Sequence, residues 1–302
     1  MFKFAKYFII IIQIYLKKMK TATKNILVPL DFSKQSLIAL EQSYNLARLS
    51  DSEITLLHVI RENNAIFGLF SEKEKEDVII KLQNKLEEFA RIATQKSNVI
   101  VHTLIAKGNV VEQILETADT INAKFIVMGS NKPDNMMKKV IGTTALKVIR
   151  EAKCPVISIE GKHHRDGCEN IILPLDLTKE TTQKVAHAMN FAKMFKSKIH
   201  AVSVVTTKDD YLISRLELQL EQVKKFIEKN EITCETKMLK VSGSNEQISN
   251  NILDYANDKK GDLIVIMTQQ ENEIVQYFVG SLAKEIIHKC RIPVMSIVPK
   301  KK

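Results

Sequence analysis

The sequence predicts two tandem copies of one α/β domain, each a five-stranded parallel sheet with helices on both faces. Three observations support this fold class. Residues 25–34 match residues 170–179 at an offset of 145 positions, and residues 155–159 match residues 293–297 in the same order. Short apolar runs alternate with amphipathic stretches in both halves, as in parallel α/β sheets. The length of 302 residues suits two domains. Ordered matches at both ends of each half indicate duplication of a whole domain.

The composition is that of a globular protein, with 45% hydrophobic and 26% charged residues. The net charge is +10, but the lysines stand beside acidic residues along amphipathic stretches and the chain has no Trp. We therefore expect no nucleic-acid partner. The four cysteines form no CxxC pair, which argues against a disulfide framework or a zinc site and favours a cytoplasmic protein.

Residues 1–21 form an N-terminal extension that differs from the rest. Its apolar run, residues 7–16, is flanked by lysines and is too short to cross a membrane. Three interpretations stay open. Met19 is the true start, which we favour; the segment is a short membrane-surface anchor; or it is a secretory signal, although no small-residue cleavage site follows. We expect no membrane partner.

The first domain is predicted at residues 22–160. It opens with a continuous apolar strand at 25–30, typical of a strand buried on both faces. Ser33 then stands at the N-cap position of a helix at 35–49. The remaining predicted strands lie at 53–60, 99–105, 125–128 and 155–159, and the remaining helices at 71–94, 110–118 and 143–150.

A polar linker with glycines and histidines, residues 161–169, leads to the second domain at 170–299. Its predicted strands lie at 171–175, 199–205, 233–239, 263–267 and 294–298, and its helices at 180–195, 211–228, 245–255 and 281–288. In the linker, His163, His164 and Cys168 could bind a metal, but a flexible segment without a fourth ligand is more often simply polar. We expect no metal.

Ligands of open parallel sheets bind beyond the carboxyl ends of the strands, where the strand order reverses. The first and fourth strands of the first domain end in polar or small residues there. The carboxylate of Asp31 can accept hydrogen bonds from ribose hydroxyls or an adenine amino group. Gly129 allows a close backbone approach. The candidate nucleotide-binding residues at these strand ends are Pro29, Leu30, Asp31, Gly129 and Ser130.

A helix start follows the fourth strand and could hold phosphate. Gly142, Thr143 and Thr144 offer backbone N–H groups, two hydroxyls and the positive end of a helix dipole. Lys132, in the intervening loop, could neutralise phosphate charge. Simpler interpretations stay open: an Asx-type turn at Asp31, a strand-end glycine at Gly129 and an ordinary helix start at Gly142.

The chain resembles the universal stress protein family through five segments, residues 25–33, 56–59, 127–130, 142–143 and 154–156. The resemblance spans residues 22–299. It implies a Rossmann-like sandwich of the adenine-nucleotide-hydrolase type, which usually dimerises through edge strands. The family's ATP-binding branch carries a G-x2-G-x9-G-(S/T) loop that holds the phosphates. The resemblance to this branch implies that Asp31 and Val59 touch the adenosine.

The sequence departs from that loop pattern. Gly129 and Gly142 are correctly separated, but Lys132 replaces the middle glycine. In the second domain we assign Thr268 to the position of the first glycine, which makes the loop one residue shorter. We therefore expect ATP in the first domain and a weaker candidate site in the second, formed by Asp176, Val204, Gly280 and Ser281.

The function that we expect is a non-enzymatic stress response in which bound ATP, or another adenine nucleotide, regulates conformation or partner binding. A nucleotide-free interaction or scaffold module is the first alternative. A slow ATP hydrolase using Asp31 or Asp134 is the second. The fusion also predicts that the two domains pair as an intramolecular pseudo-dimer, with a homodimer of two chains as a further assembly.

Overall fold

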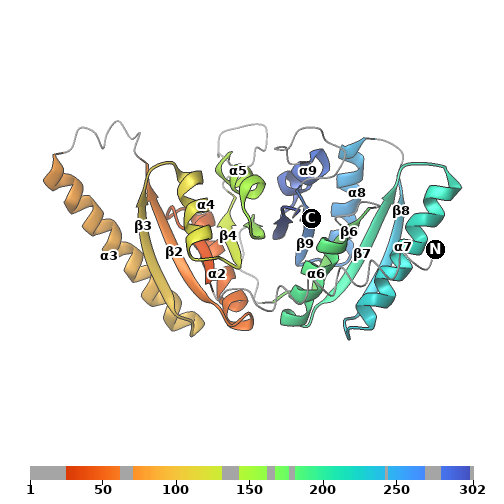
Figure 1. Cartoon of the computed structure of the whole chain (residues 1–302), viewed down its shortest axis with the longest axis horizontal. Coiled ribbons are helices and arrows are strands. Elements are labelled where there is room, and N and C mark those ends of the chain that lie inside the picture. Colours follow the sequence, from red (N-terminus) through yellow and green to blue (C-terminus); the bar gives the residue numbers. More distant parts are fainter. Residues whose placement is uncertain are drawn as a thin grey trace. The chain divides into compact units, whose positions relative to one another are not determined.

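The computed structural model describes residues 25–61, 71–130, 143–161, 167–176, 181–241, 244–268 and 280–299. These residues fall into two compact units, 25–161 and 167–299. In both units strands alternate with helices (Figure 1). The N-terminal extension at 1–21 lies outside the described residues.

The first unit contains the predicted elements in the predicted order. Ile26, Leu27 and Val28 in the first strand are fully buried, as a continuous apolar run requires. The elements are β1 (Asn25–Pro29), α2 (Lys34–Leu49), β2 (Glu53–Ile60), α3 (Glu72–Ser97), β3 (Val101–Lys107), α4 (Val110–Thr120), β4 (Phe125–Gly129), α5 (Thr143–Glu151) and β5 (Val156–Ile159).

The second unit repeats this order. Its elements are β6 (Asn170–Leu175), α6 (Thr181–Phe195), β7 (Lys198–Val205), α7 (Asp210–Glu228), β8 (Cys234–Lys240), α8 (Asn245–Asp258), β9 (Leu263–Met267), α9 (Ser281–Lys289) and β10 (Val294–Ile297). None of the described helices is long and apolar enough to span a membrane.

The two sheets have the same topology. In the first unit the strand order is β3-β2-β1-β4-β5, and in the second it is β8-β7-β6-β9-β10, with parallel pairing throughout each unit. β1 pairs with β2 on one side and with β4 on the other. The strand order therefore reverses between β1 and β4, and between β6 and β9, which confirms the predicted fold class and places a switch point in each unit.

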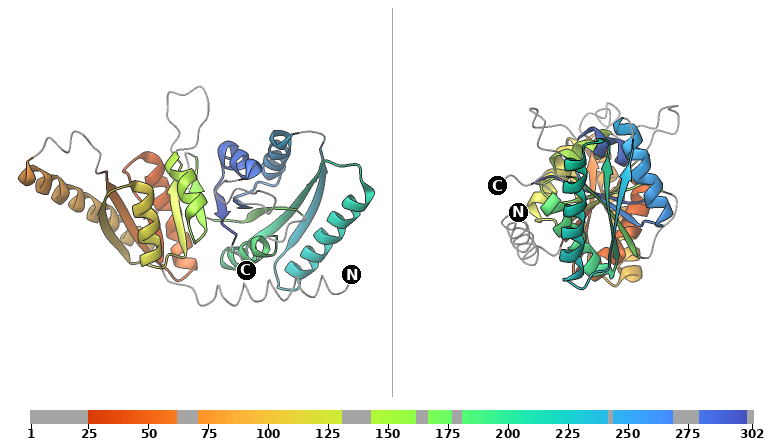
Figure 2. Two further views of the ribbon diagram at one scale, coloured as in Figure 1. Left: turned by 45° about the horizontal axis from the view of Figure 1, so that its top comes forward. Right: turned by 90° about the vertical axis from the view of Figure 1, so that its right-hand side faces the viewer.

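Helices cover both faces of each sheet. α2 packs against α3, and α4 packs against α5; in the second unit α8 packs against α9. This is the arrangement that right-handed crossovers produce, because the chain first steps outward from β1 to β3 and then returns through β4 to β5. Figure 2 shows the helices flanking the strands from two further sides.

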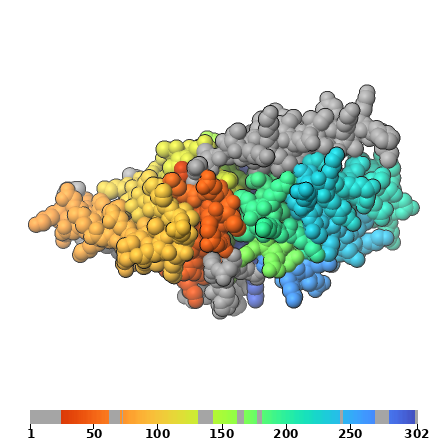
Figure 3. All heavy atoms as spheres, turned by 90° about the horizontal axis from the view of Figure 1, so that it is seen from below, coloured from red at the N-terminus to blue at the C-terminus, as the bar shows by residue number. Residues whose placement is uncertain are grey.

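The amino half of α3 extends beyond the sheet. No described side chain from Lys73 to Lys85 is buried, whereas Leu86, Ala90 and Ala93 in the carboxyl half are. Figures 1 and 2 show the amino end of α3 leading away from β3, and the helix forms an outer surface in Figure 3. The helix start is stabilised locally, because the Ser71 N–H and hydroxyl both donate to Glu74 Oε2, at 2.8 and 2.7 Å.

Element boundaries differ from the prediction by a few residues. α3 ends at Ser97, three residues later than predicted, because Asn98 adopts a left-handed conformation (φ 56°) and caps the helix. β3 consequently begins at Val101, two residues later than predicted. Asn is one of the few residues other than Gly that takes this conformation easily.

An ion-pair network joins the amino ends of three strands in the second unit to the end of α8. Glu235 on β8 accepts hydrogen bonds from Lys259 (2.9 Å) and Lys198 (3.1 Å). The buried His200 lies 3.3 Å from Glu235, and its Nε2 contacts Asn170 Oδ1 at 2.9 Å. The hydrogen bonds from Lys259 and Lys198 lower the pKa of Glu235 to about 2.

This network predicts acid sensitivity. A carboxylate with a lowered pKa stabilises the fold above its unfolded pKa, about 4.3, and this contribution is lost as the pH falls toward about 2. We expect Glu235→Gln to lower the Tm at pH 7 and to flatten the decline of Tm between pH 5 and pH 3. The loss at pH 7 should be only about 2–4 °C, because the side chain is partly exposed and solvent weakens its ion pairs. Calorimetry at several pH values measures both effects.

The control is Glu217→Gln, which changes an exposed residue of α7 outside the network. It should leave both the Tm and its pH dependence unchanged. An unaltered pH profile in Glu235→Gln would contradict the assigned role of the network.

Candidate functional site

The carboxyl ends of β1, β2 and β4 bring the predicted residues of the first unit to one edge of the sheet. Asp31 follows β1, Val59 stands near the end of β2, and Gly129 ends β4. Because β1 lies between β2 and β4, the three positions belong to adjacent strands. The sequence was therefore sufficient to place this part of the candidate site.

Asp31 forms the Asx-type turn that was its simpler interpretation, and the residue is also exposed. Its Oδ1 accepts the Ser33 N–H at 3.0 Å. Partial burial alone would raise the pKa of Asp31, but hydrogen bonds from Ser33 and Ser36 outweigh that effect and lower it. Asp31 is therefore ionised at neutral pH and can accept hydrogen bonds from hydroxyl or amino groups of a ligand.

Leu30 contributes to the turn through its backbone. Its side chain is buried, and its N–H donates to the Leu57 carbonyl at 2.8 Å. The Leu30 carbonyl accepts a hydrogen bond from His58 Nδ1 at 2.8 Å. The second unit keeps this contact with another residue, since the Ser203 hydroxyl donates to the Leu175 carbonyl at 3.0 Å. Pro29, within β1, and Val59 are half-buried.

An aromatic cluster beside Asp31 was not predicted. Phe32 has a positive φ of 62°, a strained conformation for an aromatic residue. Its ring centroid lies 4.8 Å from that of His58 and 5.8 Å from that of Phe89, and Lys85 Nζ lies 4.5 Å from it. The turn thus places an aromatic surface and a cation next to the carboxylate. Local sequence carried no signal for the positive φ.

Gly129 is required by the packing of the first unit itself. A Cβ atom at this position would lie 2.5 Å from the Gln35 carbonyl carbon, 2.6 Å from its oxygen and 2.8 Å from the Ser36 nitrogen. The close backbone approach predicted for Gly129 is therefore made by the first turn of α2. The neighbouring Ser130 is buried, and its N–H donates to the Ile159 carbonyl at 3.0 Å.

The predicted phosphate seat is described in part. Thr143 is exposed at the first position of α5, and Thr144 is half-buried. Lys132 and Gly142 lie outside the described residues. The start of α5 therefore offers an exposed hydroxyl and the positive end of a helix dipole to a ligand.

Strand pairing corrects the predicted alignment of the second loop. Ile26 pairs with Phe125, and its counterpart Ile171 pairs with Leu263. Counting along β4 and β9 from these pairs shows that Met267 occupies the position equivalent to Gly129, and Thr268 the position equivalent to Ser130. The assignment of Thr268 to the glycine position was wrong, and so was the shorter loop, since Met267 and Gly280 have the same separation as Gly129 and Gly142.

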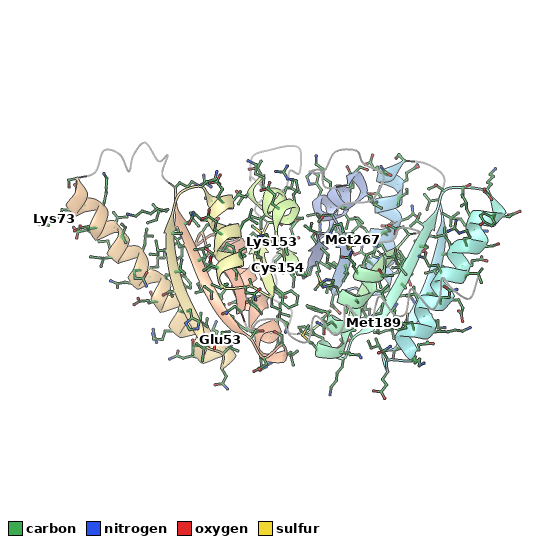
Figure 4. The ribbon with its side chains drawn as sticks, in the orientation of Figure 1. Glu53, Lys73, Lys153, Cys154, Met189 and Met267 are labelled. Atoms are coloured by element: carbon green, nitrogen blue, oxygen red, sulfur yellow. The ribbon has the colours of Figure 1, made fainter. Side chains whose placement is uncertain are left out.

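The other second-unit candidates already have contacts within the unit. Gly280 donates its N–H to the Thr268 carbonyl at 2.7 Å, and the Ser281 hydroxyl accepts a hydrogen bond from Asn245 Nδ2 at 2.7 Å. Asp176 Oδ1 accepts the Thr181 hydroxyl at 2.9 Å. Val204 is half-buried on β7, as Val59 is on β2. Figure 4 labels Met267 on β9.

The model of the universal stress protein family matches this chain twice, over residues 22–159 and 167–297. The chain belongs to the universal stress protein family. The two matches correspond to the two units of the fold, so the protein carries the universal stress domain in tandem.

Relatives in sequence agree with this assignment, and a solved structure shares the fold. A universal stress protein of Methanocaldococcus jannaschii is 30% identical over 161 residues, which is 48% of this chain and 99% of the relative. A second from that organism is 28% identical over 144 residues, or 45% of this chain and 82% of the relative. The structure of a universal stress protein from Archaeoglobus fulgidus shares the fold at 18% identity, with a TM-score of 0.74 over 92% of this chain and 97% of that one.

The four cysteines lie at buried or half-buried positions of the described residues. No group of three or more His, Cys, Asp or Glu side chains there could hold a metal ion. Cys168 is buried, and His163 and His164 lie outside the described residues. Burial raises the pKa of Cys234 to about 12, which makes its thiol unreactive. Cys154, labelled in Figure 4, is half-buried beside Lys153.

The Gly129 contact predicts a position-specific loss of stability. Gly129→Ala should lower the free energy of unfolding by about 1–3 kcal/mol, because the new methyl group must displace the backbone of α2. Urea unfolding measures this change. Gly167→Ala is the matched control, since a Cβ atom there meets nothing within 4 Å. Equal effects of the two substitutions would show that the contact with α2 is not the cause.

Proposed function

We propose that this universal stress protein binds an adenine nucleotide, most simply ATP, in its first domain, and that binding regulates conformation or partner binding without catalysis. We place it in the cytoplasm. The observation that carries the proposal is the exposed carboxylate of Asp31 at the switch point between β1 and β4. Its lowered pKa supports a role as an acceptor for ribose or adenine donors.

The surrounding groups suit the other parts of such a ligand. Half-buried Val59 and the Phe32 ring offer apolar surface close to the turn. Thr143, exposed at the start of α5, offers a hydroxyl and a helix amino terminus for phosphate. A nucleotide held at Asp31 and Thr143 would connect the first turn of α2 to α5. Occupancy could thereby be transmitted to the surfaces of both helices.

A nucleotide-free interaction module remains the second candidate, and one observation favours it. Gly129 has a sufficient structural reason in the close approach of α2, so the glycine alone does not indicate a ligand. The two functions differ in their need for Asp31, because an interaction module requires the fold but not the ionised Asp31 carboxylate.

Removal of the Asp31 carboxylate tests the proposal. We expect Asp31→Ala to weaken ATP binding at least ~10-fold, because a charge-assisted hydrogen bond is worth about 1.5–3 kcal/mol. Equilibrium dialysis of the full-length protein with labelled ATP measures this loss. Glu41→Gln, which changes a carboxylate of α2 that pairs with Lys96, is the control and should leave affinity unchanged. Absence of ATP binding by the wild-type protein at millimolar nucleotide would contradict the proposal.

The duplication alone supports a further proposal on assembly. We expect the two domains to pair within one chain as a pseudo-dimer, with a homodimer of chains as a higher assembly. Small-angle scattering of the monomer should then give a radius of gyration of roughly 20–25 Å, near the value for a compact chain of this length. A value above about 30 Å, typical of two separated domains, would contradict the pairing.

A further inference from the structure

The two domains provide an internal comparison at the candidate site. Equivalent residues of the two units are 145 positions apart from β1 to the end of β2. In the first unit Asn25 pairs with Glu53, and in the second unit the equivalent Asn170 pairs with the equivalent Lys198. Position by position, Asp176 corresponds to Asp31 and Thr181 to Ser36. Differences between the copies therefore fall on identified positions of one fold.

The first difference is a buried lysine. Lys184, on α6, is 5% exposed and stands where α2 has the fully buried Ala39. Its Nζ lies 3.8 Å from Asp176 Oδ2. The other carboxylate oxygen, Oδ1, accepts the Thr181 hydroxyl at 2.9 Å, and the Asp176 carbonyl accepts the same hydroxyl at 2.9 Å. Asp176 is thus engaged by two side chains of the helix that follows it.

The second difference lies on the neighbouring strand. Met267, 6% exposed, stands at the position of Gly129. In the first unit that position has no room for a Cβ atom, because the backbone of α2 touches it. In the second unit a buried methionine side chain extends from the corresponding position. The end of β9 therefore carries buried side-chain atoms at a position where the end of β4 carries none.

We infer that the second domain has exchanged its ligand-binding carboxylate for an internal ion pair, with Asp176 acting as the counter-ion of buried Lys184. A buried ammonium group is costly without a nearby carboxylate. If the Asp176 carboxylate turned away from Lys184 to accept ribose hydroxyls, Lys184 would lose this compensation. The positive end of α6 also favours the carboxylate in its present place. Lys184 and Met267 thus limit nucleotide binding to the first domain. The binding part of this inference rests on the proposed function, whereas the ion pair does not.

The test compares Asp31→Asn with Asp176→Asn in the full-length chain. Asp176→Asn removes the counter-charge that the described part of the chain gives to the Lys184 ammonium, and we expect it to lower the Tm of the second domain by about 5–15 °C. Asp31→Asn, at an exposed position, should lower the Tm by less than about 2 °C. Lys184→Met removes the buried charge, so Asp176→Asn combined with Lys184→Met should regain more than half of the loss. Calorimetry measures the wild-type protein, the three single variants and the double variant.

Two results would overturn the ion pair. One is a Tm of Asp176→Asn no lower than that of Asp31→Asn. The other is a double variant whose loss is the sum of the two single losses, because independent effects add.

Labelled ATP tests the binding part. We expect one ATP per wild-type chain, no change in Asp176→Asn and at least a tenfold loss of affinity in Asp31→Asn. Two ATP molecules per chain, or weaker binding in Asp176→Asn, would overturn the inference. If the wild-type chain binds no ATP, the proposed function fails, and the calorimetric comparison still decides whether Asp176 and Lys184 form the internal pair.

Discussion

The contact between Gly129 and the first turn of α2 is the constraint on which the candidate site of the first domain depends. β1 must turn sharply after Leu30 so that α2 can start directly over the end of β4. The sharp turn requires the positive φ of Phe32, and the Leu30 carbonyl is satisfied by His58. As a result, Asp31 is held exposed at the switch point with a carboxylate that stays ionised.

The second domain has different residues at the equivalent positions. It keeps the strand order and the bonded carbonyl before its aspartate, now with Ser203 as donor. It lacks the glycine, and its aspartate faces a buried lysine of the following helix. A duplicated fold allows such divergence, because one copy can retain a ligand site while the other uses the same positions for its own stability. In our interpretation, the Asp176–Lys184 pair replaces ligand binding by this aspartate in the second domain.

Much of the fold could be predicted from sequence because its central strands are buried on both faces. Continuous apolar runs such as residues 26–30 and 263–267 then identify strands, and the repeat identifies the domains. Helix ends were less accurate, since the left-handed cap at Asn98 depends on local geometry. Asp31 could be predicted because residues after a central parallel strand reach the switch point.

Other parts of the site depended on pairing and packing that no local pattern encodes. Thr268 was assigned to the position of Gly129 from the sequence alone, whereas strand register selects Met267. The burial of Lys184 could not be predicted, because a lysine on an amphipathic helix is normally exposed. The strained turn at Phe32 likewise follows from the meeting of β1, β4 and α2.

The most direct test is a crystal structure of the full-length protein grown with a non-hydrolysable ATP analogue. Our account predicts density for one nucleotide per chain, between Asp31 and the start of α5, with the Asp176–Lys184 pair intact in the second domain. Nucleotide density beside Asp176, or an empty first domain at saturating analogue, would contradict it.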